Sequence, residues 1–113
     1  MKKIIKFSDF ESIDIRLGTI IKADEYNNLH KPSIVLTIDF GEEIGIKKSS
    51  AQLRKNYIVS ELINKQIIAV VNFKPKQIGK LISEVLVLGL PDEDNEPILL
   101  SPSKKLQNGV KLY

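Results

Sequence analysis

Short runs of alternating apolar and polar residues constrain the fold of this 113-residue chain more than any other feature. In residues 13–21 and 34–40, apolar side chains recur at every second position, and a bulge is expected at Gly18. A period of two is typical of β-strands that bury one face. Residues 67–73 are β-branched and apolar on both faces, which is typical of a central strand. We therefore expect a chain built mainly of strands.

Shorter signals complete the predicted order of elements. Ser49 and Gln52 have the spacing of a capping box, which predicts a short helix at this point. A turn is expected at 41–43, a third strand at 44–46 and the helix at 49–55. A fifth strand is expected at 85–90, ending at Pro91, and is followed by an acidic loop at 92–96. Short terminal strands are expected at 98–100 and at 110–112, and a turn at Asn108-Gly109 precedes the second of them.

Three strands, a helix and two further strands follow the order of an OB-fold, a five-stranded, partly open barrel. We therefore predict an all-β fold with a short helix between strands 3 and 4, and with extensions at both termini. The length allows one domain over residues 1–113 and no second core.

Several classes of site and activity find no support in the sequence. The chain has no cysteine and a single histidine, so it cannot assemble a zinc site of four nitrogen and sulfur ligands. That histidine, His30, is expected in a surface loop. We find no Gly-rich phosphate loop, no nucleophile elbow and no paired-carboxylate motif. No segment has the roughly 20 apolar residues of a membrane span. We expect a cytoplasmic protein that is not an enzyme and needs no metal or cofactor.

The charge is unevenly distributed along the chain. Residues 44–80 contain eight basic residues and one acidic residue, Glu61, whereas the flanks contain nine basic and thirteen acidic residues. The net charge of +3 is also compatible with an ordinary solvated surface. The segregation nevertheless favours a polyanionic partner, because a surface of one sign concentrates phosphates.

The basic residues form two clusters in the sequence. Lys47 and Lys48 precede the predicted helix, whose free N–H groups at Ser50 and its neighbours would add a phosphate site. Lys74 and Lys76 follow the central strand, with Lys80 close behind, and closure of the barrel would bring both clusters to one face. Fifteen lysines and two arginines favour recognition of backbone and shape, since guanine readout prefers arginine.

Apolar residues exceed what one barrel can bury. Ile20, Val35, Ile68 and Val70 fall on faces opposite the inward series, and the apolar residues near both termini also need cover. Exposed apolar patches of this size mark interfaces. We expect folded-back termini together with a second subunit.

Several motifs in fixed order closely resemble the CsaA family, which belongs to a wider family of tRNA-binding OB modules. These are residues 10–18 (Phe-Glu-Ser-Ile-Asp-Ile-Arg-Leu-Gly), 39–41 (Asp-Phe-Gly), 44–52 (Ile-Gly-Ile-Lys-Lys-Ser-Ser-Ala-Gln), 62–66 (Leu-Ile-Asn-Lys-Gln), 70–75 (Val-Val-Asn-Phe-Lys-Pro) and 83–89 (Ser-Glu-Val-Leu-Val-Leu-Gly). The resemblance spans nearly the whole chain. It implies a homodimer whose interface includes both terminal extensions, and two activities: binding of folded tRNA and chaperoning of unfolded or export-bound proteins.

The resemblance also implies a tRNA surface at particular residues. The wider family's surface maps onto Lys47, Ser50, Asn72, Lys76 and the pair Ser83-Glu84. Where modules attached to aminoacyl-tRNA synthetases usually carry Ser-Gly-Ile and Ser-Glu-Gly-Met, this chain has the CsaA-like residues 49–51 and 83–86. Together with the charge clusters, the predicted RNA-binding set is Lys47, Lys48, Ser49, Ser50, Asn72, Lys74, Lys76, Lys80, Ser83 and Glu84.

Two functions from different classes follow. The first is a tRNA-binding homodimer that recognises folded RNA through a basic face. The alternative is an export-related chaperone that holds unfolded or preprotein segments in apolar grooves.

Overall fold

The computed structural model describes residues 1–27 and 32–113. The histidine at position 30 lies outside the described residues. The elements, in chain order, are α1 (Phe7–Glu11), β1 (Ile15–Tyr26), β2 (Ser33–Asp39), α2 (Gly41–Ile44), β3 (Ile46–Ala51), α3 (Val59–Leu62), β4 (Gln66–Val70), β5 (Lys76–Ile78), β6 (Leu81–Ser83), β7 (Leu86–Val87), β8 (Gly89–Pro91) and β9 (Pro97–Leu99).

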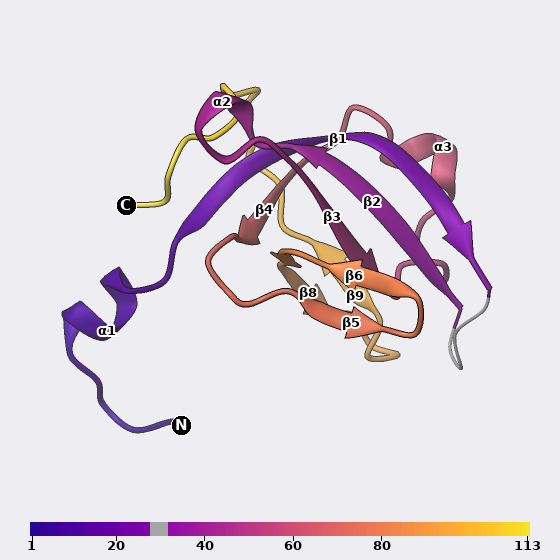
Figure 1. Cartoon of the computed structure of the whole chain (residues 1–113). Coiled ribbons are helices and arrows are strands. Elements are labelled where there is room, and N and C mark those ends of the chain that lie inside the picture. The colour runs from indigo at the N-terminus through magenta and orange to yellow at the C-terminus, as the bar shows by residue number, and fades with distance from the viewer. Residues whose placement is uncertain (28–31) are drawn as a thin grey trace.

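Five antiparallel strands form one curled sheet in the order β3-β2-β1-β4-β7 (Figure 1). Two hairpins, β5–β6 and β8–β9, form small sheets of their own. The short helix α3 comes between β3 and β4 in the chain, as expected, and its Leu62 is fully buried. These features confirm the predicted all-β, OB-like fold.

The core follows the alternation seen in the sequence. On β2, Ile34, Leu36 and Ile38 are almost completely buried, whereas Val35 and Thr37 between them are partly exposed. The buried side chains of β2 form one cluster with residues of β1, β4 and α3. The strand predicted at residues 34–40 is therefore confirmed within a residue at each end.

The register of β1 corrects the expectation of a bulge at Gly18. Gly18 lies opposite Ile67 in a regular ladder, and the register shift occurs between Ile20 and Lys22, against β2. Ile20 precedes the shift and shares a face with Gly18, which lies against Ile38 and Phe40, so Ile20 is fully buried in the core. Ile21 falls at the shift and is exposed. The prediction that Ile20 faces away from the core was wrong because Ile15 and Leu17, the inward series expected from the sequence, lie on the other face of β1 and outside the core cluster. Val70, expected on an outer face, is also buried, at 4% exposure.

The helix predicted at residues 49–55 was also wrong. β3 continues through both serines to Ala51, and the helix starts eight residues later, at Val59. The capping-box spacing at Ser49 is a local signal, and pairing of this segment with β2 overrides it. The actual capping carboxylate belongs to Glu61, whose Oε1 accepts the N–H of Ile58 at 2.9 Å.

Other boundaries differ more modestly. Residues 41–43, expected as a turn, belong to α2, which delays the start of β3 to residue 46. The central strand β4 ends at residue 70 rather than 73, and the strand expected at 85–90 is divided into β7 and β8. The strand expected at 98–100 is present as β9, paired with β8. The hairpin β5–β6 was not anticipated.

The C-terminal segment lies along the start of β1. The predicted turn at Asn108-Gly109 is present, but the strand expected after it is reduced to one bridge, Arg16 with Lys111. The N–H of Gly109 donates to the carbonyl of Leu17 at 2.8 Å. This segment covers the part of β1 that precedes its pairing with β2.

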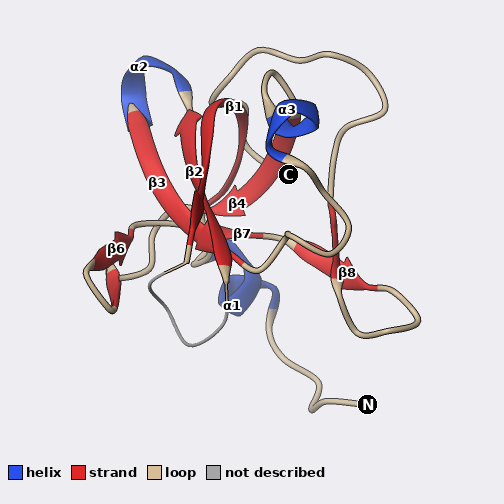
Figure 2. Cartoon of the chain, turned by 90° about the vertical axis from the view of Figure 1, so that its right-hand side faces the viewer, coloured by secondary structure: helices blue, strands red, loops and turns tan. Residues whose placement is uncertain are grey.

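The N-terminal arm, residues 1–14, extends away from the sheet in Figure 1, and Figure 2 shows the chain before α1 running outward to the N-terminus. It carries α1, in which the rings of Phe7 and Phe10 lie 6.1 Å apart. Ile4, Ile5 and Phe7 are 91%, 65% and 69% exposed. Within the described residues, no helix combines the length and apolar character needed to cross a bilayer. The expected N-terminal extension is present, and its own barrel leaves its apolar side chains uncovered.

Gly18 leaves room for core side chains, so its replacement by alanine should destabilise the fold. An added Cβ would lie 2.6 Å from Cγ2 of Ile38 and 2.7 Å from Cδ1 of Phe40, both fully buried residues. Overpacking of this kind costs about 1–3 kcal/mol. We expect Gly18→Ala to lower the urea midpoint accordingly. Lys22→Ala, on the exposed face of the same strand, is the control and should leave the midpoint nearly unchanged. Equal midpoints for Gly18→Ala and the wild type would contradict this packing.

Candidate nucleic-acid interface

The β5–β6 hairpin lies against β3, and a groove runs between them. We call this depression of about 390 Å³ the β3–β6 groove. Its lining residues are Val35, Lys48, Ser49, Ser50, Lys80, Leu81, Ile82 and Glu84. The groove therefore brings together five of the ten residues predicted to bind RNA.

Glu84 joins the two sides of the groove. Its Oε1 accepts the N–H of Lys48 at 3.0 Å, and its own N–H donates to the carbonyl of Lys48 at 2.8 Å. Its other oxygen lies 3.9 Å from Nζ of Lys47. Glu84 therefore has partners within the chain, and it partly neutralises Lys47. Among the described residues, Lys48 and Lys80 have no carboxylate within 4.0 Å, so their charges stay available to a ligand.

The two serines of β3 face opposite sides of the strand. Ser49 lies opposite Leu36 and is only 2% exposed, so its side chain belongs to the interior. Ser50 is half-buried, and its N–H donates to Oγ of Ser83 at 3.1 Å. Neither serine begins a helix, so the predicted phosphate site at a helix N-terminus is wrong.

The three lysines of the second cluster differ in their distance from the groove. Lys76 is exposed on β5, directly opposite Ser83 of β6. Because β6 lies between β5 and β3, Lys76 is separated from the groove by one strand. Lys74 is exposed in the connection between β4 and β5. Lys80 is in the turn of the hairpin and lines the groove itself. Packing of the β5–β6 hairpin against β3 thus brings Lys80 of the second cluster into the same groove as Lys48 of the first.

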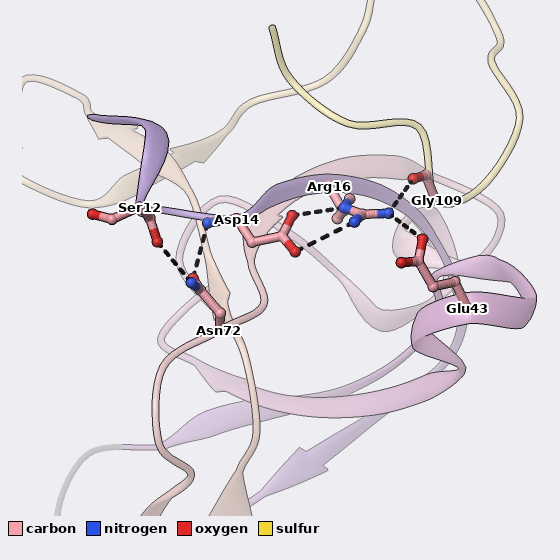
Figure 3. Close-up of polar contacts among 6 residues, drawn as sticks. All are labelled: Ser12, Asp14, Arg16, Glu43, Asn72 and Gly109. Atoms are coloured by element: carbon pink, nitrogen blue, oxygen red, sulfur yellow. Dashed lines mark hydrogen bonds and ion pairs between the residues drawn. The ribbon is translucent and has the colours of Figure 1, made fainter. Parts of the chain in front are cut away.

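Asn72 is the member of the predicted set with a clear role inside the fold (Figure 3). Its Nδ2 donates to the carbonyl of Ser12 at 2.8 Å, and its Oδ1 accepts the N–H of Asp14 at 2.9 Å. Both polar groups of this side chain therefore hold the N-terminal arm to the end of β4.

Arg16 continues the same network toward the C-terminus (Figure 3). Its guanidinium binds both carboxylate oxygens of Asp14, at 2.6 and 3.3 Å, and reaches Oε1 of Glu43 at 2.9 Å. It also donates to the carbonyl of Gly109 at 3.1 Å. The hydrogen bonds to Asp14 and Glu43 raise the pKa of Arg16 above its ordinary value. This arginine joins β1, α2 and the C-terminal segment, and is not available to a ligand.

Lys22 was not identified from the sequence as part of the outer face of the sheet. Lys22 of β1 lies opposite Thr37 of β2, which in turn lies opposite Lys48 of β3. Directly paired residues share a face, so Lys22 lies on the same outer face as Lys48, with its charge offset in part by Asp24, whose Oδ2 lies 3.6 Å from Nζ of Lys22. Strand alternation could have indicated this position, but the register shift after Ile20 could not be read from the sequence. The Gly79-Lys80 pair is a turn signal, but Ile78 is the one apolar residue of β5 before it, so the pattern was too short to predict the β5–β6 hairpin.

Comparisons with known proteins identify the family of this chain. Residues 15–111 match the family model described as "Putative tRNA binding domain". The crystal structure of chaperone CsaA from Bacillus anthracis is 46% identical, with a TM-score of 0.93, and the match covers 98% of this chain and 100% of that one. The chain belongs to the CsaA family. A second CsaA chaperone structure, from Picrophilus torridus, is 49% identical with a TM-score of 0.90, and covers 97% of this chain and 100% of that one.

Curated relatives of this CsaA-family chain include much longer proteins. The methionine–tRNA ligase of Pyrococcus horikoshii is 35% identical over 108 residues, which cover 96% of this chain and 14% of that protein. The ligase is thus similar to this chain in one small part of its length.

Among the described residues of this chain, no three histidine, aspartate or glutamate side chains gather as metal ligands would.

The groove's geometry predicts a local effect of Ser83. Ser83→Ala removes the acceptor for the N–H of Ser50, which costs about 1 kcal/mol in a partly buried hydrogen bond. We expect hydrogen exchange of the Ser50 amide to become about fivefold faster. Ser60→Ala, at an exposed position of α3, serves as the control. An unchanged Ser50 exchange rate would show that this bond does not hold the hairpin against β3.

Proposed function

We propose that this chain binds folded tRNA as a homodimer, through a basic face formed by β3 and the β5–β6 hairpin. The observation that carries the proposal is the β3–β6 groove, in which Lys48 and Lys80 have no carboxylate partner in the described part of the chain. The chain also matches a family model described as a tRNA-binding domain. Lys76 and Lys22 extend the same face on either side.

The nature of the cations favours phosphate contacts. Lysine suits phosphate as a point charge, whereas bidentate readout of guanine prefers arginine. Both arginines of the chain have carboxylate partners: Arg16 pairs with Asp14 and Glu43, and Arg54 lies 3.5 Å from Glu25. The face therefore offers lysines to the RNA backbone, and recognition depends on the shape that displays those phosphates.

The homodimer is proposed from the uncovered apolar residues at the termini. Ile4, Ile5 and Phe7 of the N-terminal arm are exposed, as are Leu112 and Tyr113 at the C-terminus. A cavity of about 130 Å³ between α1 and the C-terminal residues shows that the two termini lie together. A second copy that covers this joint surface would bury it by a two-fold interface, the commonest closed assembly.

A protein-binding chaperone is the second candidate. It is supported by the CsaA chaperone neighbours and by apolar side chains exposed on the barrel itself, including Ile46, Phe73 and Leu86. Burial of extended apolar segments of a client at such side chains would not depend on the lysines. The charge-reversal variants below would then lose RNA binding and still suppress aggregation of a denatured client.

The proposed RNA face makes a quantitative prediction for Lys80→Glu and Lys76→Glu. Each phosphate contact contributes a log–log salt slope of about 0.7–0.9, which corresponds to about five- to eightfold in affinity at about 0.1 M salt. We expect each variant to bind tRNA at least this much more weakly, with a slope that is shallower by about one contact. Filter binding at several salt concentrations measures both quantities.

Lys2→Glu is the matched control, because it makes the same charge change at an exposed residue of the N-terminal arm and should bind like the wild type. A linear oligonucleotide of equal length tests the dependence on shape, and it should bind more weakly than folded tRNA. Wild-type affinity in both groove variants, or equal binding of linear and folded RNA, would contradict the proposal.

The homodimer predicts a mass of twice the 12.7 kDa of the chain in light scattering. Phe7→Asp places a charge among the exposed apolar residues of the arm, and should shift the mass toward one chain. Ile82→Asp makes the same kind of change at an exposed residue of the β5–β6 hairpin and should leave the dimer intact. A wild-type mass near that of one chain in dilute solution would overturn this part of the proposal.

A further inference from the structure

A second and larger cavity lies on a different part of the molecule from the groove. It opens between the turn at residues 64–66, which leads into β4, and the C-terminal segment 101–108. Figure 1 shows this segment running from β9 up to α2. The cavity has a volume of about 720 Å³, which is within the range of small-ligand sites. No residue of the predicted RNA-binding set lines it.

The walls of this cavity are fixed by hydrogen bonds. Gln66 binds the backbone of Leu106 in both directions: its Nε2 donates to the carbonyl at 2.6 Å, and its Oε1 accepts the N–H at 3.0 Å. The hydroxyl of Thr19 donates to Oδ1 of Asn108 at 2.6 Å. The backbone N–H of Asn64 donates to the carbonyl of Ile20 at 2.8 Å. Both walls are thereby attached to β1 or β4, so the space is formed before any ligand arrives.

The lining has the chemistry of an anion site. Lys65, Lys104 and Lys105 line the cavity, and none of the described residues that line it is acidic. Among the described residues, no carboxylate lies within 4.0 Å of these three amines. Ser101 and Ser103 add hydroxyl groups. Ammonium and hydroxyl groups together are the donors that bind phosphate oxygens.

We propose that this cavity binds a phosphate-bearing ligand of about the size of one nucleotide. The source is either a free nucleotide or the phosphorylated end of an RNA, since both present the same chemistry to the three lysines. The inference does not rest on the β3–β6 groove, because the two sites share no lining residue.

Calorimetric titration of the full chain with adenosine 5′-monophosphate tests the proposal, with adenosine as the probe that lacks the phosphate. The monophosphate should bind at least about tenfold more tightly than adenosine, and Lys104→Ala/Lys105→Ala should weaken it at least about tenfold. Both lysines are exposed, and neither has a hydrogen-bond or ion-pair partner among the described residues, so the double variant should fold normally. Ser103→Glu, which places a carboxylate in the lining, should have the same effect.

Lys2→Ala/Lys3→Ala removes the same charge from the N-terminal arm and should bind the monophosphate like the wild type, as should Lys76→Glu. The same short RNA with and without a 5′-phosphate separates the two sources. A preference for the phosphorylated end that is lost in Lys104→Ala/Lys105→Ala identifies an RNA end, and tight binding of the monophosphate alone identifies a free nucleotide. Equal binding of monophosphate and adenosine, or binding unaffected by the Lys104 and Lys105 changes, would overturn the proposal.

Discussion

The free edge of β3 is closed by side chains, and the basic face depends on this closure. β3 is the last strand of the five-stranded sheet, so one side of its backbone has no neighbouring strand in that sheet. Glu84 and Ser83 supply acceptors for the N–H groups of Lys48 and Ser50, and the N–H of Glu84 uses the carbonyl of Lys48. Buried or half-buried backbone groups need such partners. The same contacts fix the β5–β6 hairpin beside β3, which brings Lys80 to the groove.

The closure also organises the charges of the groove. A carboxylate in a basic groove would repel phosphate if it were free, but Glu84 is held by a backbone N–H and lies close to Lys47. Lys47 is thereby partly neutralised, whereas Lys48 and Lys80 have no carboxylate within 4.0 Å among the described residues. A polyanion at the groove would therefore meet the positive charges of Lys48 and Lys80, beside the Lys47–Glu84 ion pair. Because these side chains are substantially exposed, salt screens them, and binding through them must be salt-dependent.

The parts of this structure that could be predicted from the sequence are those set by local alternation. β2 was predicted because Ile34, Leu36, Ile38 and Phe40 repeat at every second residue. The helix was misplaced because the signal at Ser49 is local, whereas the strand that replaced it depends on pairing with β2, far away in the chain. Strands of three residues, such as β5 and β6, carry too little pattern to be recognised.

The candidate site shows the same division. The residue types and the two lysine clusters were visible in the sequence, but the approach of Lys80 to Lys48 depends on packing of the β5–β6 hairpin against β3. Which serine of the pair faces the interior follows from the register of β3, in which Ser49 pairs with Leu36. Asn72 was included through family resemblance, and only its contacts with Ser12 and Asp14 show that its amide holds the arm. Side-chain direction and register, which no local pattern contains, account for these differences.

The distribution of arginine and lysine links the fold to its chemistry. Arg16 uses several donors of its planar group at once, on Asp14, Glu43 and the carbonyl of Gly109, and so joins segments that are far apart in the chain. A lysine has one ammonium group and could not span three such acceptors in fixed directions. Arg16, whose guanidinium is the type of group best suited to reading base edges, is thus used within the fold. The groups left around the groove are the flexible ammonium groups of lysines. Such groups can follow phosphates wherever a folded backbone presents them, so on the proposed RNA face selectivity would come from the spacing of the phosphates rather than from base identity.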